Sequence, residues 1–332
     1  MDIHFYQVDG LGRDSGDGGA IFDYKTVEAI RGRGIDVEAV GVFRRRALRL
    51  PPWAGRVDEG MLRIPARGVG ARTILSHEAT FDLAPVVEAD ALIVHNYFPA
   101  FSFPGRKDLE GYYRLGARDY YRRAFDLVRH VFFLSYRERA LAERDFPVIK
   151  GRTTVIPPPP APLELSGRSM NVVHLSGSDS WLPKRLSRLT GRDAENFTKA
   201  DFAIRDFGPQ PASAFGLIND RFTVGFKLKL MQMIACRDVI ASCADIAEEL
   251  EVIAPGYPFW RRVGSVSDAL EYFCDIRDSL SAEEIDAAFD AVLPGWRLPA
   301  WSDHGRIIAD VMCRFPPSAA AEKCQDPLES AS

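Results

Sequence analysis

The beginning of the chain runs from a short apolar strand through a glycine-rich turn and a helix to a second strand. Ile3 to Val8 is apolar enough to form a strand, and a turn rich in glycine follows from Gly12 to Gly19. From Ala20 to Arg31 the apolar residues recur at helical spacing, and Val37 to Val42 predicts the next strand. Two strands joined through a helix pair in parallel, so the chain is predicted to begin as a parallel α/β sheet.

The same alternation continues and then restarts after a run of four prolines, Pro157 to Pro160. Further strands are predicted at residues 91–94, 131–134, 153–156, 171–175, 202–204 and 239–241. Helices are predicted at residues 137–144, 181–189, 225–236, 269–276 and 282–292. The prolines continue neither strand nor helix and form a stiff extended spacer. We therefore expect an α/β fold with two Rossmann-like domains facing a cleft, at residues 1–160 and 161–315, followed by a disordered tail at 316–332.

Composition and charge exclude several classes of protein. The net charge of −4 speaks against a nucleic-acid partner. The five cysteines are odd in number and form no CxxC pair, which argues against a disulfide framework and against a zinc site. No signal peptide and no long uncharged apolar stretch are recognisable, so we expect a cytoplasmic protein. The Tyr- and Arg-rich segment from Tyr112 to Arg123 fits an amphipathic surface helix, and it also allows peripheral contact with the inner face of a membrane.

Polar residues directly after the predicted strands are the candidates for catalysis, because ligands of open α/β sheets bind beyond the carboxyl ends of the strands. His95 follows the strand at 91–94, where a histidine suits a general base or an acceptor contact. The alternative is a histidine that satisfies backbone groups at the end of the strand. Asp14 and Asp17 in the glycine-rich turn are the other candidates for a base, unless that turn is only a surface loop.

The most specific pattern in the chain is the segment from Gly225 to Ser242, GFKLKLMQMIACRDVIAS. It resembles the donor-binding helix and following strand of GT-B glycosyltransferases. The positions that fit are Lys229, Leu230, Ala235, Cys236, Val239, Ala241 and Ser242. The step from Val155 to Pro158 resembles the end of the N-terminal domain in such enzymes, and Ser135 with Arg137 to Arg139 resembles the strand–Ser–helix that precedes it.

The resemblance implies transfer of a sugar from a nucleoside-diphosphate sugar to a glycan or lipid-linked acceptor, as in polysaccharide biosynthesis, with no cofactor and no essential metal. A glycine turn that leads into a helix presents N–H groups and the positive end of the helix dipole to a diphosphate. By this resemblance the donor-binding residues are Gly177, Lys184, Gly225, Lys229 and Gln232. We expect Lys229 in the cleft and Lys227 on the exposed face of the helix.

Departures from the GT-B pattern leave a second hypothesis open. Gln232 stands where many members carry a glutamate, and nothing acidic lies near Thr223, where another is common. The alternative is therefore a catalytically degenerate GT-B scaffold that binds a nucleotide sugar or a protein. Other enzyme classes find less support: the turn at 16–21 lacks the third small residue of GxGxxG, and neither a GxxxxGK[ST] phosphate loop nor a GxSxG elbow occurs.

Overall fold

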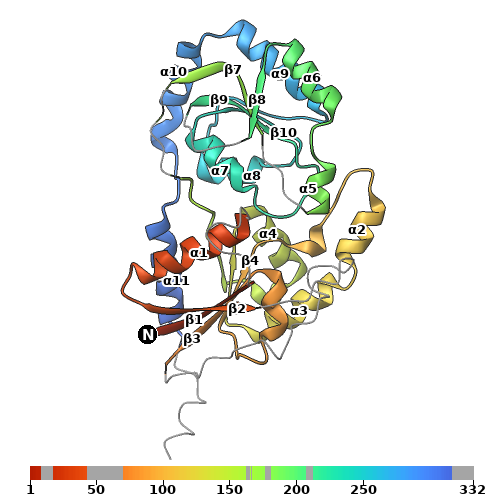
Figure 1. Cartoon of the computed structure of the whole chain (residues 1–332). Coiled ribbons are helices and arrows are strands. Elements are labelled where there is room, and N and C mark those ends of the chain that lie inside the picture. Colours follow the sequence, from red (N-terminus) through yellow and green to blue (C-terminus); the bar gives the residue numbers. More distant parts are fainter. Residues whose placement is uncertain are drawn as a thin grey trace, which may run out of the picture.

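The computed structural model describes residues 1–8, 18–42, 70–161, 165, 167–175, 181–206 and 212–315. These residues form two parallel sheets with helices on their faces, one sheet in each half of the molecule (Figure 1). The predicted fold class, an α/β protein of two Rossmann-like domains, is confirmed. Asp14, Asp17, Gly177 and the predicted tail lie outside the described residues.

The first sheet has the strand order β2-β1-β3-β4-β5-β6, and every neighbouring pair is parallel. Its strands are β1 Asp2–Val8, β2 Asp36–Val42, β3 Arg72–Ser76, β4 Ala91–Val94, β5 His130–Phe133 and β6 Thr153–Val155. Its α-helices are α1 Gly18–Arg31, α2 Lys107–Arg114, α3 Ala117–Leu127 and α4 Tyr136–Asp145, with 3-10 turns η2 Glu78–Leu83, η3 Phe98–Ala100 and η4 Pro147–Ile149. After β1 the chain adds β2 on one side of it, and it then adds β3 to β6 on the other side. The direction in which strands are added therefore reverses between β1 and β3.

The second sheet has the order β11-β10-β9-β7-β8 and is also parallel. Its strands are β7 Arg168–Leu175, β8 Ala203–Asp206, β9 Ser213–Ile218, β10 Val239–Ser242 and β11 Trp260–Arg262. The helices of this half are α5 Leu182–Leu186, α6 Gly191–Lys199, α7 Leu228–Ala235, α8 Ala247–Ile253, α9 Val266–Ser279 and α10 Ala282–Val292, followed by the 3-10 turn η5 Leu293–Gly295. Here the order reverses between β7 and β9, so each half has its own switch point, where open α/β sheets bind ligands.

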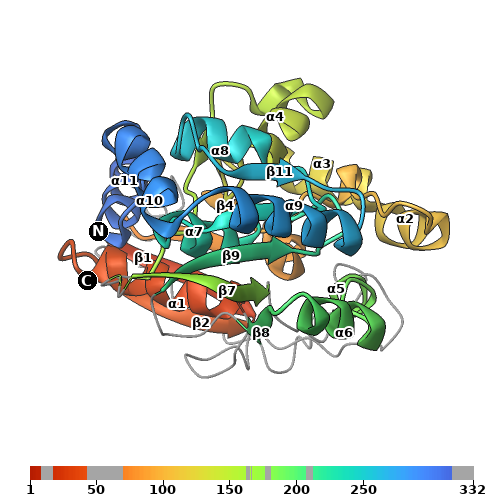
Figure 2. The same cartoon turned by 90° about the horizontal axis from the view of Figure 1, so that it is seen from above.

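Helix α11, Trp301–Cys313, returns from the second half and packs against α1 of the first (Figures 1 and 2). The two helices touch closely at Gly305, where an added Cβ would lie 2.1 Å from the backbone oxygen of Ala29. The buried guanidinium of Arg72 donates to the carbonyls of Met312 and Phe315 at the end of α11. The segment 301–313, which we placed in the second domain from the sequence, packs against α1 of the first half, and the predicted domain bounds stay a prediction.

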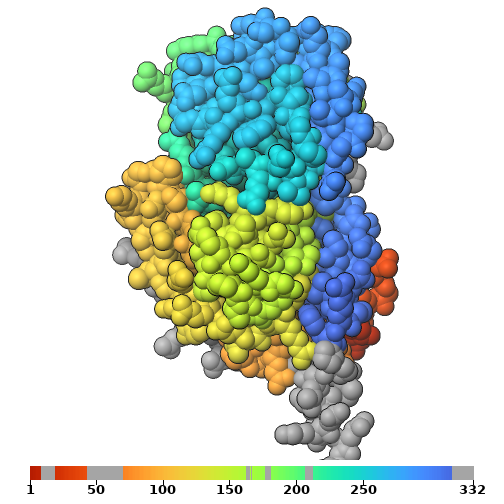
Figure 3. All heavy atoms as spheres, turned by 180° about the vertical axis from the view of Figure 1, so that it is seen from behind, coloured from red at the N-terminus to blue at the C-terminus, as the bar shows by residue number. Residues whose placement is uncertain are grey.

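The two halves are in direct contact, with α4 of the first against α8 of the second (Figure 3). At another part of the seam the indole of Trp181 donates to the hydroxyl of Tyr113 at 2.9 Å, and the rings of Trp181 and Phe222 lie 4.7 Å apart. Thr223 accepts a hydrogen bond from the backbone N–H of Ser102 at 2.9 Å. The two halves therefore meet along a seam that includes α4 and the segment before α2 from the first half, and Trp181, Phe222, Thr223 and α8 from the second.

Candidate active site between the two sheets

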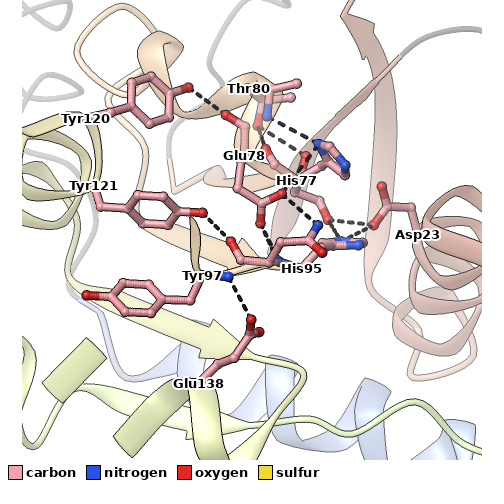
Figure 4. A network of polar contacts seen from close by, with 12 residues as sticks. Asp23, His77, Glu78, Thr80, His95, Tyr97, Tyr120, Tyr121 and Glu138 are labelled. Carbon is pink, nitrogen blue, oxygen red and sulfur yellow. Dashed lines mark hydrogen bonds and ion pairs between the residues drawn. The ribbon is translucent and has the colours of Figure 1, made fainter. Parts of the chain in front are cut away.

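A buried cluster of Asp23, Ser76 and His95 lies at the carboxyl ends of β3 and β4 (Figure 4). The Ser76 hydroxyl donates to Asp23 Oδ1 at 2.5 Å, and His95 Nε2 lies 3.0 Å from Ser76 Oγ and 3.2 Å from Asp23 Oδ1. Because the hydroxyl proton goes to Asp23, the proton of a neutral His95 sits on Nε2, where both oxygens accept it. The other ring nitrogen, Nδ1, is then the basic one.

Helix α1 brings Asp23 to this cluster, and the ring of Phe22 packs edge-on against His95 at 5.3 Å. A buried carboxylate beside a histidine stabilises the charged imidazolium and fixes the ring orientation. His95 therefore has the surroundings of a general base at the position after β4 where the sequence placed it. Its catalytic role stays a prediction.

The buried carboxylate of Glu78 fixes the backbone that follows β4. It accepts hydrogen bonds from the N–H groups of His95 and Asn96, both at 2.7 Å, and from the Asn96 side-chain amide at 3.2 Å. Sequence reasoning missed Asp23, His77 and Glu78. The turn after β3 would have directed attention to the latter two, but β3 itself was not predicted.

A second buried carboxylate, Glu138 of α4, joins the two halves. Its Oε1 accepts the N–H of Tyr97 at 2.8 Å and, from the second half, the N–H of Gly225 at 2.7 Å, while Oε2 is buried without a hydrogen-bond partner. Burial raises the pKa of Glu138 from its usual 4.5 to about 7. The contact with Gly225 thus depends on a carboxyl group that titrates near neutral pH.

We expect Glu138→Gln to flatten the pH dependence of stability. A raised pKa in the folded state means that the stabilising proton is bound below pH 4.5 and is lost as the pH rises to about 7. The wild-type free energy of unfolding should fall by up to about 3 kcal/mol relative to that of the glutamine variant over this range. Chemical denaturation at several pH values measures the difference. Glu195→Gln, at an exposed position of α6, serves as the control, and a stability difference between wild type and Glu138→Gln that does not vary with pH would contradict the prediction.

A cavity lies at the seam between α4, the segment before α7 and the turn before α8. The residues lining it are Ser135, Arg137, Phe222, Thr223, Gly225, Phe226, Lys227, Leu230, Ala244, Asp245, Ile246 and Glu249. Across the seam the Ser135 hydroxyl donates to Glu249 Oε1 at 2.5 Å, and burial raises the pKa of Glu249. The second Glu249 oxygen is buried without a hydrogen-bond partner.

Lys227 is the buried cation of this cavity, with only 9% of its side chain exposed. Its ammonium donates to the carbonyls of Val224 and Phe222 at 3.0 and 3.3 Å, and it lies 3.7 Å from both the Phe222 ring centroid and Asp220 Oδ2. Burial lowers the pKa of Lys227 to about 8; the charges of Asp220 and Glu138 oppose this shift, and those of Lys184 and Arg137 add to it. Two carbonyls and the Asp220 carboxylate surround the ammonium, and a lysine with a lowered pKa that lines a cavity is a candidate for a functional site.

The structure corrects our expectation that Lys227 lies on the exposed face of a helix. Helix α7 begins only at Leu228, so Lys227 precedes it and helical spacing does not govern its direction. Lys229 is partly buried on α7 and does not line the cavity. Gln232 accepts the N–H of Ala161 in the linker at 2.9 Å and does not line the cavity either.

Of the remaining predicted donor residues, Gly225 and Lys184 lie at or near the cavity, and Gly177 cannot be placed. Gly225 lines the cavity, with φ +77 and its Cα against Asn96, and Lys184 on α5 is near enough for its charge to act on Lys227. Gly177 lies outside the described residues. Among the residues that the structure describes, no three His, Cys, Asp or Glu side chains are grouped to hold a metal ion.

Comparisons with known proteins show a likeness of fold. No protein-family model matches the sequence, and no curated protein matches it. The pneumococcal O-GlcNAc transferase GtfA, solved with UDP and GlcNAc, is similar with a TM-score of 0.57 at 10% identity, over 95% of this chain and 99% of that one. An E. coli trehalose-6-phosphate structure bound with UDP-2-fluoro glucose is similar with a TM-score of 0.56 at 9% identity, over 96% of this chain and 100% of that one. The chain thus has the two-domain GT-B fold of such nucleotide-sugar transferases.

Proposed function

We propose that this chain transfers a sugar from a nucleoside-diphosphate sugar to an acceptor in the cleft between its two sheets. The observation that carries the proposal is the buried Lys227, which lines a cavity at the seam of the two halves. The two similar structures support it, since both were solved with UDP or a UDP-linked sugar.

On the donor side, the cations near the cavity would hold the diphosphate. Lys227 and Lys184 would bind its oxygens, with Arg137 from the first half as a third charge. The leaving group of glycosyl transfer is a nucleoside phosphate, so fixed positive charge stabilises the transition state as the bond breaks. With lysines in this role, no essential metal or cofactor is required. Gly177, Lys229 and Gln232 remain part of the proposed donor site through the sequence resemblance alone.

On the acceptor side, His95 would remove the proton of the attacking hydroxyl. Its Nδ1 is the basic nitrogen, and Asp23 would stabilise the imidazolium that forms. Asp14 and Asp17 stay alternative bases on the strength of the sequence.

The acceptor is proposed to be a glycan or a lipid-linked sugar, with the protein at a membrane surface. Exposed Arg114, Arg122 and Arg123 on α2 and α3, beside Leu115 with 76% of its surface exposed, support contact with anionic lipid. In the described part of the chain, every helix is too short or too polar to cross a bilayer.

Nucleotide binding tests the proposal directly. We expect one of UDP, GDP, ADP or CMP, or one of their sugars, to raise the Tm, since a ligand at a hundredfold excess over its Kd adds about 2.7 kcal/mol. Lys227→Met should weaken that ligand's Kd about tenfold or more, because a charge-assisted phosphate contact is lost. Isothermal titration calorimetry measures both proteins.

Lys199→Met, an exposed lysine of α6, is the matched control and should bind like the wild type. An unchanged Kd in Lys227→Met would remove Lys227 from the donor site. If no nucleotide or nucleotide sugar binds to the wild type, the degenerate scaffold becomes the better description.

A further inference from the structure

His77, directly after β3, has a backbone conformation that side chains rarely adopt. Its φ is 74 and its ψ is 140, outside the left-handed helical region where Asn and Asp are tolerated. Such conformations cost free energy for any residue with a Cβ, and they persist where the surrounding structure fixes them. They cluster at functional sites, so the choice of histidine here requires a reason.

The position of His77 is the switch point of the first sheet. Strand β3 pairs with β1 where the strand order reverses, and His77 is the first residue beyond the carboxyl end of β3. Its ring lies 5.3 Å from the ring of His95, and both rings are on the side of Asp23 (Figure 4). Of the two histidines, His77 is the more accessible, with 22% of its side chain exposed against 5% for His95.

The local hydrogen bonds determine which atom His77 presents. Its Nδ1 accepts the N–H of Ala79 at 3.2 Å, so the proton of the neutral ring sits on Nε2. The neutral ring of His77 is therefore oriented so that Nε2–H is its hydrogen-bond donor. Capping the turn alone does not require histidine, because Asn offers a similar acceptor to a backbone N–H and glycine suits the backbone better.

We propose that His77 is a further ligand-binding residue of this site, whose Nε2–H donates to a hydroxyl oxygen of the sugar in the cleft. The inference rests on the proposed function, because it assumes a sugar at the switch point. It explains why a strained conformation carries a bulky polar ring beside the Asp23–Ser76–His95 cluster.

The test compares stability with binding in His77→Gly and His77→Asn. The glycine variant removes the strain, and the asparagine variant keeps an acceptor for Ala79. We expect a Tm equal to or above that of the wild type for His77→Gly, because strain relief offsets the lost cap. For both variants we expect about tenfold weaker affinity for the nucleotide sugar that the wild type binds, with unchanged affinity for its nucleoside diphosphate.

Asp201→Gly is the matched control, since Asp201 has φ 60 in an exposed turn of the second half. It should keep or raise the Tm and leave both affinities unchanged. Unchanged affinity of the His77 variants for the nucleotide sugar would overturn the inference alone. A fall in Tm together with both affinities would show that His77 is structural and would also overturn it. A wild-type protein that binds neither nucleotide nor nucleotide sugar would instead overturn the proposed function, and the inference with it.

Discussion

Gly305→Ala is expected to destabilise the protein by at least about 3 kcal/mol, which corresponds to a Tm lower by roughly 6–12 °C. The added Cβ would lie 2.1 Å from the Ala29 carbonyl oxygen and 2.6 Å from its carbon. Both are backbone atoms of α1, so no side chain can rotate away and α11 must separate from α1. Thermal and chemical unfolding measure the loss.

The same substitution should lower activity, because α1 carries Asp23 to His95 and a shift of α1 disturbs that pair. Gly111→Ala is the control: Gly111 is also helical, but nothing lies within 4 Å of its added Cβ. It should stabilise by about 0.5–1 kcal/mol, as alanine does in place of an exposed helical glycine. A Gly305→Ala protein as stable as the wild type would show that the α1–α11 contact adjusts freely.

Gly225→Ala is expected to separate the two halves at the site. Gly225 has φ +77, and its added Cβ would lie 2.5 Å from Asn96 Oδ1. The Asn96 amide is held by Glu78, so relieving this clash breaks a hydrogen bond in addition to the backbone strain. We expect the substitution to destabilise the arrangement in which Gly225 packs against Asn96 by about 2–3 kcal/mol. If only that arrangement binds the donor, the affinity for the donor should fall roughly 30- to 150-fold.

Gly105→Ala separates the two causes, because Gly105 has nearly the same φ, +78, and nothing within 4 Å of its added Cβ. Gly105→Ala should lower the free energy of unfolding, because alanine is strained at this φ, and it should leave nucleotide binding unchanged. Calorimetric titration of the three proteins with the same nucleotide checks the expectation. Equal affinities in the Gly225 and Gly105 variants would contradict a role for the Gly225–Asn96 contact in binding.

Several apolar strands were predictable from the sequence, but β3, β9 and β11 were missed. The runs at 91–94 and 239–241 lie in β4 and β10, with every residue of both strands buried. Strand β3 was missed because it begins with Arg72 and Thr73. Arg72 is buried because carbonyls at the end of α11 accept its hydrogen bonds, and those partners are 240 and 243 residues away. Local patterns carry no information about such partners.

The residues of the candidate site also include some that the sequence pattern indicated and some that it did not. His95 was predictable because it directly follows a recognisable strand. Asp23 lies inside a helix, where an acidic residue is ordinary, and only the packing of α1 brings it 3.2 Å from His95. Lys227 was assigned to the wrong surface because the helix begins at Leu228, three residues after the predicted start at Gly225.

The sequence by itself determined the alternation of strands and helices, the two-domain α/β class and the residues that follow the apolar strands. These depend on hydrophobic periodicity and turn chemistry, which act over a few neighbouring residues. The tertiary structure alone decided which polar groups are buried together: Asp23 with His95, Glu138 with Gly225, and Lys227 with Asp220. Burial removes water from these groups, and only a partner brought by the fold can replace the lost hydrogen bonds or charge.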